Sequence, residues 1–400
     1  MIQRATRAVS VVFILCGLGI ASLLSRVPQF RDELDLRPGP LGRLLLMIAI
    51  GSLISLPLSG LMVHRLGVKR TVVIFSVLCQ VGLALAAVGV LVDVVMVGAG
   101  FFLIGVGNGF WDVAQNVEAA AVEQQLGRSI MSRFHAGFSV GTVAGALIGA
   151  GMNALDVPVT GHLLVMAAIV GVGVPWATTG FLPGDHATAQ HGDDADGAAP
   201  RHPLAAWKEK RTLLIGLFVL TMAFTEGTGN DWLGVATIDG YGASDVTGSM
   251  AYVLFVAAMT GGRWFGPQAL DRFGRVLVLR VSAAMSLAGV IIVVVGPSLV
   301  TAMIGIVLWG LGAALGFPTG MSAAADDPKY AAGRVSVVAT VGYMAFLAGP
   351  ALIGLLGDHV GVLKALTLTA ALLAVGLITA GATAPLPVAT AEPASTTDGA

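Results

Sequence analysis

The chain has 400 residues, of which 56% are apolar and 11% charged, and its mean hydropathy is +0.86. A soluble protein of this length would be about 25% charged, so lipid must solvate part of the apolar surface. The formal net charge of −1 argues against a nucleic-acid partner and against a polybasic protein of the membrane surface.

Apolar runs long enough to cross a bilayer as α-helices recur along the chain, since a hydrocarbon core of about 30 Å needs about 20 residues. They predict twelve spans, near residues 8–26, 41–62, 71–91, 94–118, 134–153 and 161–181, and then near 212–232, 248–268, 276–296, 299–323, 335–357 and 363–384. We therefore expect an all-α membrane protein with a six-helix bundle in 1–181 and another in 212–384. The polar segment 182–211 predicts a cytoplasmic linker, and 385–400 a disordered tail.

The two sets of spans repeat one another. His64 to Gly67 corresponds to Asp271 to Gly274, which lies 207 residues later in the chain, and the same offset relates the glycines of the fourth and tenth predicted spans. Two parallel repeats related by a pseudo-twofold axis along the membrane normal would place a substrate path between the halves.

Orientation follows from the basic residues. With the N-terminus in the cytoplasm, most of the 22 Lys and Arg residues fall in segments on the inner side. We therefore expect a multi-pass protein of the cell (inner) membrane with both termini cytoplasmic.

A short loop joins the second and third predicted spans and has a counterpart after the eighth. Its notable residues and those of the second copy are Gly60, His64, Arg65, Gly67, Lys69, Arg70, Asp271, Arg272, Gly274 and Arg275. These paired loops resemble the signature of the major facilitator superfamily, which has an Asp where this chain has His64. The resemblance implies that the loop charges lock an inner gate. The alternative is that the basic residues only set the topology.

Three further segments resemble the fucose-permease/YbjJ-like branch of that superfamily. They are Arg26-Val27-Pro28, the stretch from Asp112 to Asn116 with His135 downstream, and Glu226-Gly227 with Asp231-Trp232. This branch contains proton-coupled sugar importers, so the resemblance implies secondary transport of a small polar solute.

Ionisable groups inside spans are costly and therefore mark candidate functional positions. Asn108, Asp112 and Asn116 recur every four residues and share one face of the fourth predicted span. Such a polar stripe should face a water-filled cavity, and a carboxyl group in apolar surroundings can exchange a proton at accessible pH. We expect Asp112 to couple protons, and Asn108, Gln115 and Asn116 to bind solute. The alternative is a structural ion pair between Asp112 and Arg263 or another base.

Glu226 lies near the middle of the seventh predicted span, with Asp231 and Trp232 further out. A carboxylate beside an indole suits a sugar, because hydroxyl groups bond to the acid while an apolar ring face stacks on the aromatic side chain. We expect Glu226 to take part in proton coupling, and Asp231, Trp232 and Arg26 to bind solute. Alternatively, Trp232 and Arg26 only mark the outer interface.

Arg263 and His135 are candidate charge partners within the membrane. Arg263 lies in the eighth predicted span at a depth that would allow it to pair with Asp112 across the halves, or it snorkels to the inner interface. His135 begins the fifth predicted span, where it either carries a proton or has a structural role.

The fifth predicted span carries a row of glycines at four-residue spacing. They are Gly137, Gly141, Gly145 and Gly149. This smooth face predicts close helix packing and a moving contact between the halves.

The sequence shows no nucleotide-binding loop, zinc-ligand spacing or catalytic triad, so we expect neither an enzyme nor a cofactor. The leading hypothesis is a monomeric transporter in the lipid bilayer that works by alternating access and takes up a small polar solute, such as a sugar, with protons. The alternative is proton-driven efflux of drugs or metabolites. Drug antiporters of the superfamily usually have Gly-Pro in the fifth span, whereas here Ala146 follows Gly145.

Overall fold

The computed structural model describes residues 1–126, 130–183, 205–327 and 330–386. Within these ranges the chain is almost entirely helical and contains no strand. The all-α prediction is confirmed for this part of the chain. The predicted linker 182–211 and tail 385–400 lie largely outside the described residues.

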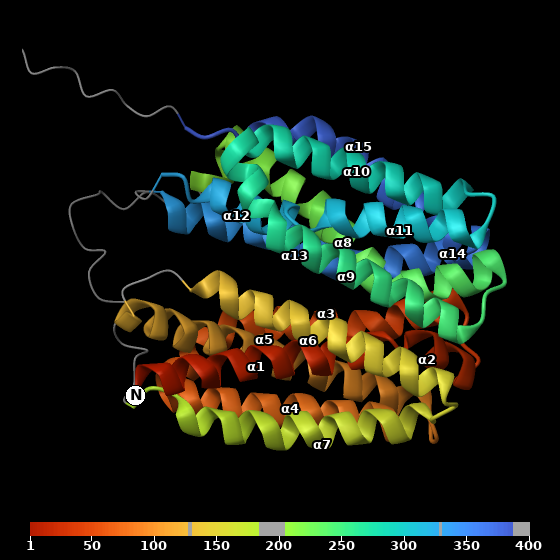
Figure 1. Cartoon of the computed structure of the whole chain (residues 1–400), viewed down its shortest axis with the longest axis horizontal. Coiled ribbons are helices and arrows are strands. Elements are labelled where there is room, and N and C mark those ends of the chain that lie inside the picture. Colours follow the sequence, from red (N-terminus) through yellow and green to blue (C-terminus); the bar gives the residue numbers. More distant parts are fainter. Residues whose placement is uncertain (127–129, 184–204, 328–329, 387–400) are drawn as a thin grey trace, which may run out of the picture.

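The helices form two bundles that lie one above the other in Figure 1. The first bundle contains α1 (Ile2–Leu24), α2 (Val27–Glu33), α3 (Pro38–Leu66), α4 (Val68–Gly89), α5 (Val94–Leu126), α6 (Met131–Ala154) and α7 (Val159–Ala177), followed by the 3₁₀ turn η1 (Thr178–Gly180). The second contains η3 (Ala205–Lys208), α8 (Lys210–Tyr241), α9 (Asp245–Phe273), α10 (Arg275–Val295), α11 (Leu299–Ala313), α12 (Gly316–Ala324), α13 (Ala331–Val360), α14 (Val362–Ala365), α15 (Thr367–Thr379) and η4 (Ala380–Thr383).

Eleven segments of the described chain are long and apolar enough to cross a membrane. Three of these segments each contain two consecutive helices, namely α1 with α2, α11 with α12, and α14 with α15. The remaining long helix, α9, has 29 residues but is less apolar, because it contains Arg263 and ends with Asp271 and Arg272. It packs against α8 and α11 of the second bundle and against α6 of the first, and it corresponds to the eighth predicted span, 248–268.

The repeat is visible in the backbone of the two paired loops. Gly67 ends α3 and begins α4 with φ 78° and ψ 156°, and Gly274 joins α9 to α10 with φ 78° and ψ 157°. A positive φ of this size is readily adopted only by glycine. The same tight connection therefore occurs at equivalent places in both bundles.

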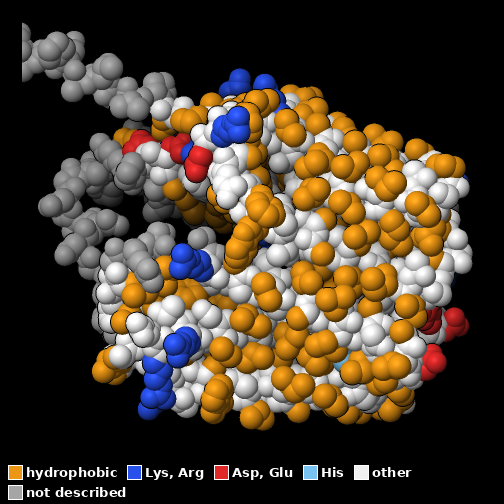
Figure 2. All heavy atoms as spheres, in the orientation of Figure 1, with side chains coloured by type: hydrophobic (Ala, Val, Ile, Leu, Met, Phe, Trp, Pro, Cys, Tyr) orange, Lys and Arg blue, Asp and Glu red, His pale blue; other side chains and the backbone are white. Residues whose placement is uncertain are grey.

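The two bundles meet at one membrane face and separate at the other. We call the face at which α1 begins and η4 ends the terminal face, and the other the opposite face. At the opposite face, Asp358 of α13 accepts a hydrogen bond from the Gly39 amide of α3 at 3.0 Å, and Asn153 of α6 donates to Ser249 of α9 at 3.3 Å. Figure 2 shows the surface notched between the bundles at the terminal face. The two bundles are thus closed against each other at the opposite face.

The glycine row of α6 packs against α1. A Cβ at Gly141 would overlap the Ile14 carbonyl oxygen, and one at Gly145 would stand 2.5 Å from the Leu18 carbonyl oxygen. The close packing predicted for this row is therefore present, but the expectation of a moving contact between the halves is wrong. Both helices belong to the first bundle, and the row joins them into one unit.

Candidate functional site

The polar stripe of α5 forms a small hydrogen-bonded group around Asp112. The Asp112 Oδ1 atom accepts from Gln115 Nε2 at 3.1 Å and from Asn116 Nδ2 at 3.3 Å. Asn116 Nδ2 also donates to the Asp112 backbone oxygen at 2.8 Å. One turn earlier, Asn108 Oδ1 accepts from the thiol of Cys16 at 3.8 Å. The stripe orients a half-buried carboxylate with amide donors from its own helix.

His135 lies where charges from both bundles meet. Its imidazole is exposed and packs edge-on against Phe13, with the ring centroids 5.3 Å apart. Both the Asp112 carboxylate and the Arg263 guanidinium act electrostatically on it. Asp112 and His135 belong to the first bundle and Arg263 to the second, so charges from both bundles act on this imidazole.

Arg263 pairs with Glu226 rather than with Asp112. Its Nη2 atom donates to Glu226 Oε1 at 2.7 Å, and its Nε atom to the Ala314 backbone oxygen at 3.4 Å. The side chains of Glu226 and Arg263 are 15% and 30% exposed, so the pair is largely shielded from water. The pairing of Arg263 with Asp112 across the halves is therefore absent in this state. The guanidinium is paired instead with the Glu226 carboxylate of the adjacent helix α8.

The structure separates the other residues expected to bind solute. Trp232 is completely buried and packs on α13, where a Cβ at Gly354 would stand 3.2 Å from its ring. Arg26 is also buried and donates to the Val157 backbone oxygen at 2.6 Å, not to Asp231. Asp231 is half-buried and acts electrostatically on Tyr252. Because both side chains are buried, a solute between the two bundles would not reach Trp232 or Arg26 in this state.

An aromatic group that the sequence analysis did not identify lies beside the charged cluster. Tyr343 of α13 is 36% exposed and lies within electrostatic reach of Asp112. Its ring contacts those of Phe317 and Phe346, with centroid separations of 6.1 Å and 6.3 Å. Phe346 in turn lies against Gly227, next to Glu226. Tyr343 thus presents an exposed aromatic ring within electrostatic reach of Asp112.

The two paired loops differ in what their charges contact. His64, Arg65, Lys69 and Arg70 of the first loop are exposed, as are Asp271 and Arg272 of the second. Arg275 is different, because its Nη1 atom donates to Asp326 Oδ1 at 2.9 Å and Oδ2 at 3.0 Å.

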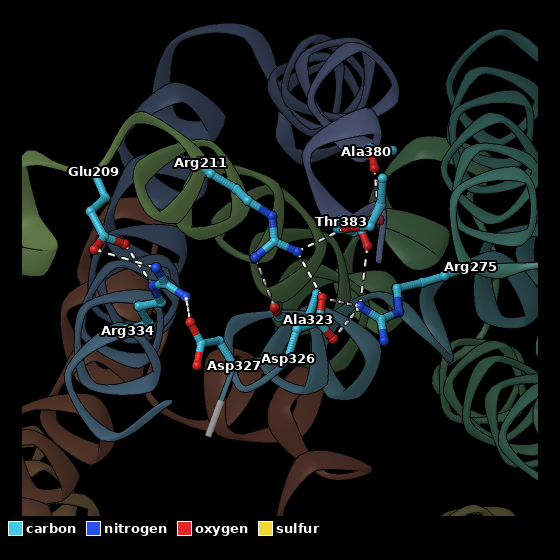
Figure 3. A network of polar contacts seen from close by, with 10 residues as sticks. Glu209, Arg211, Arg275, Ala323, Asp326, Asp327, Arg334, Ala380 and Thr383 are labelled. Carbon is cyan, nitrogen blue, oxygen red and sulfur yellow. Dashed lines mark hydrogen bonds and ion pairs between the residues drawn. The ribbon is translucent and has the colours of Figure 1, made fainter. Parts of the chain in front are cut away.

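Figure 3 shows the charge network to which Arg275 belongs, at the terminal face of the second bundle. Asp326 also accepts from Arg211 Nη2 at 2.7 Å, and Arg334 Nε donates to Glu209 at 2.6 Å. Arg211 Nη2 donates to the Ala384 carbonyl oxygen and Arg275 Nη1 to that of Thr383, which attaches the end of η4 to the starts of α8 and α10. The sequence analysis did not identify these partners, apart from naming Arg275.

The first bundle has no such ion pair at the equivalent positions. Counting back 207 residues, Arg275 corresponds to Val68 and Asp326 to Ala119, and both of these are buried. The halves therefore differ at both positions together: a pair of charges in the second bundle is replaced by two apolar side chains in the first.

Two helical bundles that close around polar groups from both halves define a membrane carrier. The chain belongs to the Major Facilitator Superfamily, whose family model matches residues 9–350. The uncharacterized transporter y4wD of Sinorhizobium fredii is 32% identical over 360 residues, which cover 88% of this chain and 91% of that protein.

Solved structures of the superfamily share this fold. The nucleoside transporter NupG matches with a TM-score of 0.76 and 14% identity, covering 94% of this chain and 98% of that chain. The Fucose:proton symporter FucP of E. coli matches with a TM-score of 0.64 and 15% identity, covering 94% and 98%. The predicted superfamily is confirmed. The protein is a membrane transporter of the alternating-access type, and not an enzyme, since its family and relatives are transporters.

Proposed function

We propose that this transporter takes up a small polar solute, such as a sugar or a related ring compound, together with protons. The proposal rests on His135, on which Asp112 of the first bundle and Arg263 of the second both act electrostatically, and on the hydrogen bonds that hold Asp112 and Arg263 within their own bundles. Ionisable side chains at membrane depth mark solute and proton pathways. A cluster shared by both halves changes its surroundings whenever the halves move relative to each other, as coupling requires.

Asp112 is the proton carrier in this proposal. While ionised, it is held by Gln115 and Asn116 and places a negative charge at the interface between the bundles. Protonation removes that charge, which lowers the desolvation cost of closing the halves around the site. The release of the proton to the other side of the membrane then restores the acceptor for the next cycle.

The solute binds between the charged cluster and the aromatic group. Asn108 and Asn116 supply amide groups for hydroxyl groups, Glu226 supplies a carboxylate, and the exposed ring of Tyr343 supplies a stacking surface. The names of two structural neighbours support this class of solute, since NupG is a nucleoside transporter and FucP a Fucose:proton symporter. Both of those solutes are polar ring compounds.

The membrane orientation is part of the same proposal. The terminal face carries most of the basic residues of the chain, such as Arg4, Arg7, Arg65 and Arg70, and cytoplasmic loops are enriched in Lys and Arg. We therefore place both termini in the cytoplasm of a cell whose inner membrane holds the carrier as a monomer. In that orientation the notch between the bundles opens to the cytoplasm (Figure 2).

Proteoliposomes test the coupling directly. The first step is a thermal-shift screen of the purified protein with sugars, nucleosides, organic acids and drugs, since a ligand of the folded state raises its melting temperature. With the solute found, Asp112→Asn should abolish proton-driven accumulation but retain exchange of labelled for unlabelled solute. The matched control is Asp156→Asn, an exposed carboxylate with φ 52°, a conformation that Asn also adopts.

Two outcomes would contradict the proposal. Full proton-driven accumulation by Asp112→Asn would exclude Asp112 as the coupling group. Expulsion of solute from the cytoplasmic side in exchange for protons would replace uptake with efflux, and binding of drugs but not polar solutes in the screen would point the same way.

A further inference from the structure

An open pocket lies at the terminal face of the second bundle, away from the interface between the halves. It has a volume of about 480 Å³ and is lined by Lys210, Arg211 and Leu214 of α8 and by residues of the segment 381–386. Arg280 of α10 lies beside this pocket. If Gly381, which lines the pocket, carried a Cβ atom, that atom would be 3.3 Å from Arg280 Nη2. Since Gly381 has no side chain, the guanidinium can lie over the backbone there.

The pocket carries an excess of positive charge. Arg211 and the nearby Arg275 share the single carboxylate of Asp326. Lys210 and Arg280 are exposed and have no acidic partner among the residues that the structure describes. Two cations are therefore available at this pocket for an external anion.

Apolar side chains surround these cations on the outside of the bundle. Leu277 and Val281 flank Arg280 on α10, and each is 54% exposed. Ile378 of α15 is 79% exposed, and Leu213, next to Arg211, is 38% exposed. In a membrane protein such side chains face acyl chains. The cations thus lie at the boundary between the apolar band and water, which is the depth of lipid phosphates.

We propose that this pocket binds the phosphate headgroup of an anionic phospholipid. Lys210 and Arg280 contact the phosphate, and the acyl chains lie along Leu277, Val281 and Ile378. Basic pockets between helices on the cytoplasmic side hold anionic headgroups in this way. The exposed apolar flanks favour a lipid over a free phosphate ion, which would leave them without a partner. The site is separate from the proposed transport pathway and does not depend on the solute.

Native mass spectrometry of the full chain tests the proposal with lipids of matched acyl chains. Phosphatidylglycerol should bind in preference to phosphatidylcholine, and the variant Lys210→Gln/Arg280→Gln should bind phosphatidylglycerol roughly 30-fold more weakly, the sum of two basic groups near the surface. The matched control Arg4→Gln/Arg7→Gln removes two exposed basic residues from the terminal face of the first bundle and should leave the affinity unchanged.

A second variant keeps the charges and alters the pocket. Gly381→Leu places a side chain where Arg280 lies and should weaken phosphatidylglycerol binding without changing the net charge. Thermal melts of each variant without lipid verify that it is folded. Equal binding of both lipids, or an undiminished preference in Lys210→Gln/Arg280→Gln, would overturn the proposal. Displacement of the lipid by an equal concentration of glycerol phosphate would also overturn it, because the site would then bind a free anion.

Discussion

Closure at the opposite face depends on a glycine, and replacing it should open the carrier there. Gly42 of α3 lies against Pro350 and Gly354 of α13, in the other bundle. A Cβ at Gly42 would stand 2.4 Å from the Pro350 carbonyl oxygen and 3.2 Å from the Gly354 Cα. The atoms it meets belong to the backbone, so no side-chain rotation can relieve the overlap. Gly42→Ala should therefore force α3 and α13 apart at this face.

The magnitude follows from the cost of overpacking. An extra carbon in a close-packed contact costs about 1–3 kcal/mol, and only the state in which α3 touches α13 bears this cost. The ratio of the two carrier states should then shift roughly 5- to 150-fold toward the state that is open at the opposite face. The stability of each bundle by itself should hardly change.

Distances between spin labels report this shift. Leu61 on α3 and Ser336 on α13 are exposed near the terminal face, and the two native cysteines are buried. In Gly42→Ala, the population with a short separation between the labels should grow. The matched control is Gly51→Ala on the same helix, whose Cβ would also stand 2.4 Å from a carbonyl oxygen, but that of Phe102 in the same bundle.

The control should lower thermal stability in both states and leave the distance distribution unchanged. The reasoning fails if Gly42→Ala folds with the distribution of the unmodified chain, or if Gly51→Ala shifts it equally.

Two further predictions concern ion pairs. Asp326→Asn removes the carboxylate shared by Arg211 and Arg275, whose side chains are 27% and 20% exposed, and should lower stability by about 2–3 kcal/mol in a thermal or denaturant melt. Arg263→Gln leaves the carboxylate of Glu226 unpaired at 15% exposure, so it should be less stable than the double variant Arg263→Gln/Glu226→Gln, with a coupling of about 1–3 kcal/mol in a double-mutant cycle.

Each of these experiments has its own control. The control for Asp326→Asn is Arg37→Gln. Arg37 Nε lies 3.9 Å from Asp358 Oδ1 and the Arg37 side chain is 76% exposed, and such exposed ion pairs contribute little to stability. A loss in Arg37→Gln as large as in Asp326→Asn would contradict the argument from burial. For Arg263, additive effects of the two single substitutions would show that the pair has no energetic coupling.

The helices were predictable from the sequence because lipid imposes a length and a composition on each span. The span predicted at 71–91 corresponds to α4, Val68–Gly89. The one predicted at 94–118 begins correctly but extends to Leu126 in α5, since nothing in apolarity marks where a helix ends once it has left the hydrocarbon. The repeated loop was predictable for another reason, namely that a backbone with positive φ requires glycine at the same place in each half.

The partners of the charged residues were not predictable in the same way. Glu226 and Arg263 were both identified as ionisable groups within spans, but their contact joins two helices across 37 residues of sequence. Which carboxylate meets the guanidinium depends on the rotation of α8 and α9 about their axes, and one ionisable residue near the middle of a span does not determine that rotation. The burial of Trp232 in this state was not predictable, because an indole in an apolar helix gives the same sequence pattern whether it faces an interface or a neighbouring helix.

The network around Asp326 did leave a signal in the sequence. Aligning the halves at the offset of 207 residues pairs Val68 with Arg275 and Ala119 with Asp326. Two opposite charges that are present together in one repeat and absent together in the other indicate a contact. This signal lies at positions where the two halves differ and not at those where they agree.

This asymmetry gives the two bundles different responses to the surrounding medium. In the second bundle, α8 and α10 are joined to Asp326, just after α12, by ion pairs whose arginines are partly reached by water. Dissolved salt screens such pairs over a Debye length of about 8 Å at physiological ionic strength. Val68 and Ala119 carry no charge to screen. A rise in ionic strength at the terminal face, as in a cell losing water to osmotic stress, should therefore weaken these contacts in the second bundle and leave the apolar contacts of Val68 and Ala119 unchanged.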